Sequence, residues 1–275
     1  MERMHEQETT LVSKIDGKEF GSTLREKKEA ALTALAETLL AKDRSGAEEA
    51  AFNARASIGG IRDLWILINE DKAQRLLRAD VVWEIRNKRD IPVVAEYESN
   101  VLIFPAVGLE YRKRGIYTDV LLRDLEEEGI RAKLIRCDGL SVGEDLGSIY
   151  RDAMQYAEDA GAVFPDRKWL SIRQIRFAKK CRELLETGPE SDPFRGLIHL
   201  LDKGREGDEI LRTLSCYFLD TDCSITETAN VLYIHKNTVK YRIARARDLL
   251  GFRVGEWPES MELSYALGVR RLAAK

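Results

Sequence analysis

The stretch that decides the fold of this chain is Ser224-Ile225-Thr226-Glu227-Thr228-Ala229-Asn230-Val231-Leu232-Tyr233-Ile234-His235-Lys236-Asn237-Thr238-Val239-Lys240-Tyr241-Arg242-Ile243. Its Ser-x-x-Glu opening predicts a capping box, in which Ser224 and Glu227 each satisfy one free backbone amide at the start of a helix. Ile225, Ala229 and Leu232 then recur at helical spacing, and they predict the apolar face of a short first helix.

A second helix is predicted to begin shortly after Tyr233. Its apolar residues recur at steps of four, three and four before the helix stop at Gly251, and they are Val239, Ile243, Ala246 and Leu250. Tyr233 occupies a turn position where many helix-turn-helix proteins use glycine, and a positive φ there is unfavourable for tyrosine. Two short helices joined by a tight turn predict a helix-turn-helix motif.

Positive charge is concentrated on the second helix. The formal net charge of the whole chain is −3, yet the segment from Ser224 to Arg253 has two acidic residues against Lys236, Lys240, Arg242, Arg245, Arg247 and Arg253. An acidic protein with its positive charge gathered on one helix is suited to bind a phosphate backbone there. The alternative is a solvated basic helix in an ordinary bundle. The order of cap, turn, apolar stripe and charge favours nucleic-acid binding over it.

The outward face of the second helix follows from a rotation of about 100° per residue. With Val239 towards the core, the opposite face carries Asn237, Tyr241, Ala244, Arg245 and Asp248, flanked by Thr238 and Lys240. Its N-terminal part would enter the major groove of DNA. There Asn237 can pair with adenine, Lys236 with guanine and Thr238 with a thymine methyl group.

Other residues of this helix are expected to bind phosphates. Arg242 and Arg245 lie nearer the rim of the groove, where they would fix register without reading sequence. His235 falls at the N-cap position, so its ring can approach a phosphate beside the free amides of the first turn. The candidate DNA-binding residues are therefore His235, Lys236, Asn237, Thr238, Lys240, Tyr241, Arg242 and Arg245.

The same residues carry a family resemblance. The segment from His235 to Arg242 resembles the His-x-Asn-Thr-(Leu/Val)-x-Tyr-Arg signature of the PucR/CdaR family of bacterial transcription regulators. Leu211–Phe218 resembles the Leu-x-x-Thr-Leu-x-x-Tyr helix of that family, and Met261–Leu267 resembles its closing helix. The resemblance covers about residues 194 to 272. It implies a transcription regulator that binds operator DNA.

Length and composition favour a globular, cytoplasmic protein. A chain of 275 residues with 44% hydrophobic and 33% charged residues is typical of two domains, or of one large domain with a satellite. No run of eighteen apolar residues occurs and the N-terminus is polar, so neither a membrane span nor a signal peptide is expected. The four cysteines form no C-x-x-C and the three histidines are scattered. We therefore expect reduced thiols, no metal and no cofactor.

The chain before the DNA-binding segment divides into a helical and an α/β part. Residues 23–41 and 47–56 favour amphipathic helices, which either pack on their own chain or on a second protomer. Strands are predicted over 63–68, 91–96, 101–105 and 131–137, and helices over 71–88, 109–128 and 144–161. This alternation predicts helices packed against a mixed sheet. The fold class is therefore α+β, with an N-terminal helical segment, an α/β middle domain and an all-helical C-terminal domain.

The middle part also resembles a degenerate GGDEF-like domain. The resemblance rests on the element order and on Ser148-Ile149-Tyr150-Arg151-Asp152-Ala153. An active nucleotide cyclase would place carboxylates in the hairpin between the second and third strands to hold metal and triphosphate. That turn reads Glu98-Ser99-Asn100, while Gly207-Asp208-Glu209 is expected to begin a helix in the other domain. We therefore expect no enzyme activity and no catalytic residues.

The Pro/Gly-flanked stretch 188–193 marks the best domain boundary. We expect an N-terminal helical segment (1–60), a GGDEF-like domain (61–172), a linker helix (173–193) and a helix-turn-helix domain (194–275). The predicted function is sequence-specific regulation of transcription by a homo-oligomer bound to double-stranded operator DNA, with a small-molecule effector as a further partner. The alternatives are a signalling enzyme or nucleotide-binding sensor with a tethering DNA module, and an architectural DNA binder.

Overall fold

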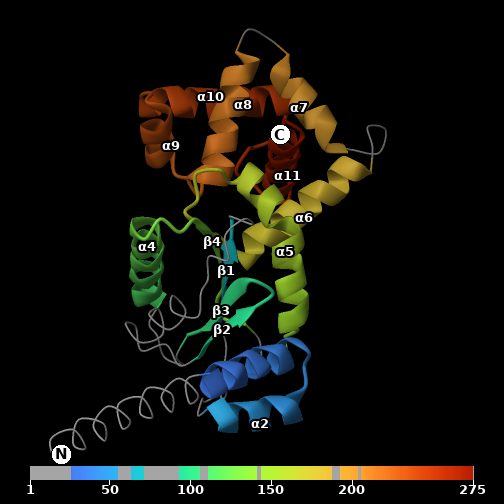
Figure 1. Cartoon of the computed structure of the whole chain (residues 1–275). Helices are drawn as coiled ribbons and strands as arrows, with labels where there is room; N and C mark the ends of the chain where they lie inside the picture. The colour runs from blue at the N-terminus through green and yellow to red at the C-terminus, as the bar shows by residue number, and fades with distance from the viewer. Residues whose placement is uncertain are drawn as a thin grey trace, which may run out of the picture. The chain divides into compact units, whose positions relative to one another are not determined.

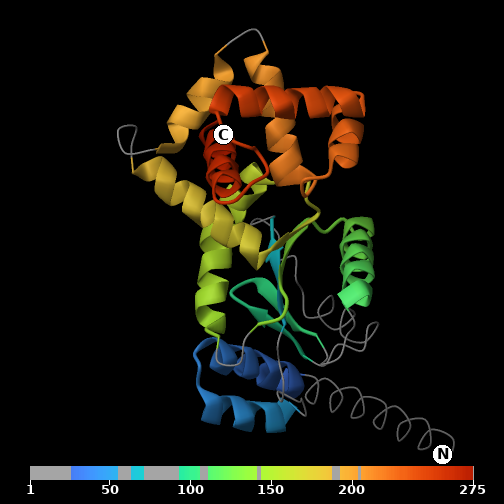
Figure 2. The same ribbon diagram turned by 180° about the vertical axis from the view of Figure 1, so that it is seen from behind.

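The structure is a computed structural model, and it describes residues 26–54, 63–70, 93–105, 111–140, 144–187, 193–203 and 206–274. The chain forms two compact units, Met1–Tyr150 and Arg151–Lys275 (Figure 1; Figure 2). None of the helices within the described ranges has the length and apolar content that a membrane crossing requires. The four segments expected from the sequence stay a prediction.

The first unit begins with a pair of helices, one over residues 26–40 and α2 over Arg44–Ala54. Between them the chain reverses at Lys42, which has a φ of 60°. Leu35 and Ala36 have no exposed surface, so the amphipathic face expected from the sequence is buried by the chain itself. The side of α2 that is buried consists of small residues, namely Ala47, Ala50, Ala51 and Ala54.

The sheet of the first unit has the strand order β2-β3-β1-β4, with β1 Leu64–Asn69, β2 Val93–Tyr97, β3 Asn100–Phe104 and β4 Ala132–Cys137. β1 pairs with β3 and with β4, and β2 pairs with β3, all three antiparallel. Trp65 lies opposite Ile103 on one side and Arg136 on the other. β1 lies between β3 and β4 at the centre of the sheet. This position explains why β1 is a continuous apolar run rather than an alternating one.

The three pairings fix the relative directions of these four strands. β1 and β2 are both antiparallel to β3, so they run in the same direction. β3 lies between them. α4 (Tyr111–Glu127) carries the chain from β3 to β4, and β1 lies between those two strands. This is the split β-α-β arrangement. The helix predicted over 71–88 lies outside the described residues.

The β2–β3 hairpin forms as predicted. Glu98 and Ser99 take φ values of 47° and 66°, the left-handed pair that a type I′ turn requires. Asn100 is buried directly after the turn. Its side-chain amide donates to the Glu98 carbonyl at 3.2 Å and to the Tyr150 hydroxyl at 3.0 Å. The Asn69 amide donates to the Asn100 Oδ1 atom at 3.3 Å.

The second unit is mainly helical. Its elements are the part of α5 (Leu146–Val163) from Arg151 onward, β5 Trp169–Ser171, α6 Ile172–Glu186, α7 Pro193–Asp202, α8 Gly207–Ser215, the π-helix η1 Cys216–Asp220, α9 Ile225–Leu232, α10 Lys236–Leu250 and α11 Glu259–Ala273. Gly207 begins α8, as its Gly-Asp-Glu sequence predicted. Residues 188–192 of the expected boundary lie outside the described residues.

The core of the second unit forms around α11. The ring of Tyr265 stacks on Phe177 of α6, with 4.7 Å between centroids and 10° between planes. At Gly268 a Cβ atom would lie 2.7 Å from the Cys181 sulfur, so only glycine allows α6 and α11 to approach this closely. Arg271 donates to both carboxylate oxygens of Asp220, at 2.7 and 2.6 Å. α11 thereby packs against α6 and is bonded to η1.

Candidate nucleic-acid interface

α9 begins at Ser224, as predicted, but with half of the expected capping box. The Ser224 Oγ atom accepts a hydrogen bond from the Glu227 amide at 3.2 Å. The Ser224 amide itself donates to the Thr221 carbonyl at 2.9 Å, so it is already satisfied by the preceding turn rather than by the Glu227 side chain. Thr228, which the apolar pattern did not single out, is fully buried and shares a 2.7 Å hydrogen bond with Thr221.

The turn after α9 has the strained conformation that the sequence suggested. Tyr233 lies in the left-handed region, with φ 54° and ψ 41°. The Ile234 amide donates to the Ala229 carbonyl at 3.0 Å, and the Tyr233 amide to the Asn230 carbonyl at 3.2 Å. These two bonds form a Schellman motif. The Tyr233 side chain is 96% exposed.

His235 is the N-cap of α10, as predicted. Its Nδ1 atom accepts a hydrogen bond from the Asn237 amide at 3.2 Å. An Nδ1 atom that accepts is unprotonated, so a neutral ring carries its proton on Nε2. Lys236 and Asn237 are exposed in the first turn of the helix, while Thr238 is half-buried.

α10 buries the face that its apolar stripe predicted. Val239 and Ala246 have no exposed surface, and Ile243 and Leu250 are half-buried. The helix ends at Gly251, whose φ of 78° makes it the expected stop. On the exposed part of the helix lie Lys236, Asn237, Lys240, Tyr241, Arg245, Arg247 and Asp248. Figure 1 shows α9 at a steep angle to α10, as in a helix-turn-helix.

Arg242 points towards α8. Its side chain is only 16% exposed and forms an ion pair with Glu209. A second nitrogen donates to the Oγ1 atom of Thr213 at 3.2 Å, and Thr213 is fully buried. We expected Arg242 near the rim of the interface. In the structure its guanidinium connects α10 to α8, and its contact with phosphate stays a prediction.

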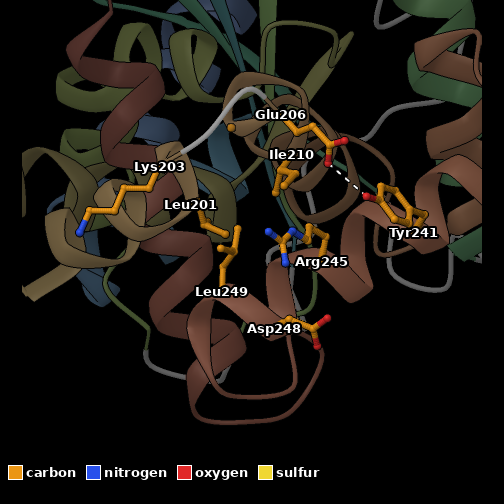
Figure 3. A pocket seen from close by; sticks show the side chains of 9 residues that line it. Leu201, Lys203, Glu206, Ile210, Tyr241, Arg245, Asp248 and Leu249 are labelled. Carbon is orange, nitrogen blue, oxygen red and sulfur yellow. Dashed lines mark hydrogen bonds between the residues drawn. The ribbon is translucent and has the colours of Figure 1, made fainter.

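Tyr241 and Arg245 line a groove of about 460 Å³ against α7 and α8 (Figure 3). The Tyr241 hydroxyl donates to Glu206 Oε2 at 3.3 Å. In Figure 3 the Arg245 guanidinium lies between Ile210 and Leu249. Both residues are exposed, but the groove places them on the flank of α10 that faces the rest of the unit.

The other flank of α10 carries basic residues that the sequence did not assign to DNA. Arg247 and Arg253 line a groove of about 270 Å³ together with Lys240 and with Ile225, the first residue of α9. Arg247 pairs with Asp248 at 2.8 Å, and Arg253 pairs with Glu256 at 2.9 Å. Both arginines contributed to the charge pattern. Their position beside the start of α9 could not be read from helical periodicity, because it depends on the fold of the 251–255 loop.

Outside α10, the described residues include buried thiols and a buried amide at the β2–β3 hairpin. Within the described ranges no group of three or more His, Cys, Asp or Glu side chains is arranged to hold a metal ion. Burial raises the pKa of Cys181 to about 12 and that of Cys216 to about 11, so both thiols stay protonated at neutral pH. At the β2–β3 hairpin, the side-chain amide of the buried Asn100 donates to the Tyr150 hydroxyl. Burial raises the pKa of its partner Tyr150 to about 12.

Comparison with known proteins agrees with this geometry in the C-terminal part. Residues 210–269 match the PucR C-terminal helix-turn-helix domain, so the resemblance drawn from the His-x-Asn-Thr signature is confirmed there. This matched range includes α9, the Tyr233 turn and α10. The GGDEF-like resemblance of the middle part stays a prediction.

Two curated relatives from Bacillus subtilis (strain 168) match the chain. The purine catabolism regulatory protein is 40% identical over 125 residues, which are 44% of this chain and 23% of the relative. The uncharacterized protein YsfB is 30% identical over 117 residues, which are 42% of this chain and 30% of that relative. The matches therefore span less than a third of each relative.

One similar solved structure is the regulator of polyketide synthase expression from Bifidobacterium adolescentis. It is 18% identical, with a TM-score of 0.34, over 89% of this chain and 94% of that one.

Proposed function

We propose that the chain is a sequence-specific DNA-binding transcription regulator that acts as a homo-oligomer. The observation that carries this proposal is the start of α10. There His235 caps the helix, and the side chains of Lys236 and Asn237 stand exposed on a helix matched to the PucR helix-turn-helix domain. An exposed, capped and basic helix start is the part of a helix-turn-helix that reads the major groove.

The residues of α10 divide by role. Lys236, Asn237 and Thr238 stand in the first turn, where they would contact base edges. Lys240 and the Nε2 atom of His235 would bind phosphates on either side. Tyr241 and Arg245 would contact the backbone from the opposite flank. Arg242 would position α10 from the side that faces α8, through its bonds to Glu209 and Thr213.

The size of this interface supports oligomer formation. One recognition helix covers too few base pairs for useful specificity, so two copies would bind adjacent half-sites. We propose that the middle domain is a non-catalytic, GGDEF-like unit for pairing or sensing. The Asn100 hydrogen bonds support this, because a cyclase would need carboxylates rather than a buried amide at that hairpin.

The place of action and the effector are proposals of the same kind. A regulator of bacterial genes acts in the cytoplasm, where the chromosome is accessible. The name of the 40% identical relative refers to purine catabolism, and purine compounds are therefore the first small molecules to test as effectors. Because the match covers 23% of that relative, its role as a whole is not carried over.

The test is selection of genomic DNA fragments by the purified chain, followed by titration of a selected fragment and a scrambled one at the same salt concentration. We expect the selected fragment to bind at least about a thousandfold more tightly. Equal affinities would show an architectural binder. Light scattering on the same sample gives the oligomer size, and formation of a cyclic nucleotide with Mg²⁺ or Mn²⁺ would show that the middle domain is an enzyme.

A further inference from the structure

Tyr233 has an unfavourable backbone conformation for its residue type. Six non-glycine residues among those that the structure describes have a positive φ, and Tyr233 is the aromatic one. The left-handed region brings Cβ close to the following carbonyl oxygen, which glycine avoids and a bulky side chain does not. A tyrosine at this position therefore requires a favourable interaction that offsets the backbone cost.

The contacts described within the second unit do not offset this cost. The cap at the end of α9 consists of backbone hydrogen bonds, from Ile234 to Ala229 and from Tyr233 to Asn230, which glycine would form equally well. At the end of α10, Gly251 does occupy the corresponding left-handed position, with a φ of 78°. The Tyr233 side chain is 96% exposed, so its ring gains almost nothing from packing.

The place of Tyr233 in the motif suggests what it gains instead. It stands two residues before His235, the N-cap of α10. Since consecutive Cα atoms are about 3.8 Å apart, the two Cα atoms lie within about 8 Å of each other. If the start of α10 enters a major groove, the exposed Tyr233 ring would therefore lie within reach of the DNA strand that borders the groove.

We propose that Tyr233 is a DNA-backbone contact that positions the turn of the helix-turn-helix on one strand. Its ring would pack on a deoxyribose, and its hydroxyl would donate a hydrogen bond to a neighbouring phosphate oxygen. The neighbouring cations support DNA as the occupant, since Lys236 and Lys240 are exposed on the same motif. This inference rests on the proposed function.

The test compares three variants of the full chain on the selected fragment. Tyr233→Gly relieves the backbone, and we expect an unchanged or higher melting temperature with about tenfold weaker DNA binding. Tyr233→Asn, a residue that tolerates the left-handed region, should lose the same affinity. Tyr233→Phe keeps the ring and should lose about threefold. Because tyrosine carries no charge, the salt dependence of binding should stay unchanged in all three.

The matched control is Ser99→Gly, which relieves a φ of 66° at an exposed residue of the first unit. It should leave DNA affinity unchanged. Wild-type affinity in both Tyr233→Gly and Tyr233→Asn would overturn the inference. A loss of affinity that parallels a loss of melting temperature in both variants would also overturn it. A smaller oligomer would overturn it too, because it would place Tyr233 between copies of the chain. If the wild-type protein selects no DNA, the proposed function itself fails.

Discussion

The outer face of α10 at its N-terminus and the side of α10 that faces α8 are both basic, yet their charges have different surroundings. Lys236 and Lys240 are exposed on the outer face. Arg242 has a side chain that is 16% exposed, next to Glu209 and the buried Thr213. A count of cations treats these residues alike. Their surroundings separate the exposed lysines, which would release counterions if α10 binds DNA as proposed, from Arg242, which is bonded to α8.

A similar contrast holds along the flank that faces α7 and α8. Tyr241 and Arg245 are exposed, but Glu206 accepts a hydrogen bond from the Tyr241 hydroxyl. If α10 binds DNA as proposed, Glu206 would compete with DNA for Tyr241. Mutations can measure the strength of this competition. Their expected effects decrease from Arg242 to Glu206.

The largest effect is expected when the charge of Arg242 is reversed. Arg242→Glu places two carboxylates together at Glu209 and leaves Thr213 without its donor. We expect a loss of roughly 1–3 kcal/mol in the free energy of unfolding, between the values for exposed and buried pairs, because Glu209 is 62% exposed. Urea titration followed by circular dichroism measures it.

The swapped double variant Arg242→Glu/Glu209→Arg separates positioning from DNA contact. If Arg242 positions α10, the swap should recover most of the stability and most of the DNA affinity. Recovered stability with lost affinity would mean that the guanidinium itself binds phosphate. Arg253→Glu is the control, because Arg253 is 76% exposed and its reversal should hardly change stability.

Asn237→Ala should have the next largest effect, and it should be confined to sequence preference. If Asn237 pairs with an adenine edge, discrimination at one base pair should relax by roughly 1–3 kcal/mol. Binding to a panel of single-base operator variants measures it, with Asn230→Ala as the control at an exposed position of α9. An equal loss on operator and scrambled DNA would instead make Asn237 a phosphate or capping residue.

Lys240→Ala should weaken binding to every sequence by a similar and smaller amount. Loss of one phosphate contact lowers the slope of log affinity against log salt by about one unit. Lys180→Ala removes the same charge from α6, and we expect no change in slope there. An unchanged slope in Lys240→Ala would move the phosphate contact to Arg247 or Arg253, which line the same flank of α10.

The sequence predicted the local structure of the DNA-binding motif well and its long-range contacts poorly. Val239, Gly251 and the His235 cap follow from helical periodicity and from end signals within a few residues. The bond between Arg242 and Glu209 joins residues 33 positions apart, so no local pattern contains it. The same limit applies to the sheet. Strands β1 to β4 were recognised by their composition and β5 was not, and the antiparallel order of β1 to β4 depends on distant pairings such as that of Trp65 with Ile103.

The two capping boxes show how the same signal can have different outcomes. Ser171 and Gln174 form a complete box at the start of α6, which the sequence analysis did not single out. Ser224 and Glu227 have the same spacing and form half of one. The difference lies in the preceding residues, because the Thr221 carbonyl already accepts from the Ser224 amide. A motif of four residues cannot show whether its amide has another acceptor nearby.

The smallest effect is expected at Glu206. Glu206→Gln removes one negative charge beside α10 and weakens the hold on the Tyr241 hydroxyl. Because the bond is 3.3 Å long and exposed, we expect DNA affinity to rise by no more than about 0.5 kcal/mol, a factor of about two. Glu256→Gln removes an equal charge next to Arg253 and serves as the control. Repeating Glu206→Gln in a Tyr241→Phe background decides the cause. If the gain disappears, Glu206 acts by holding Tyr241 away from DNA, and if it persists, Glu206 acts only through its charge.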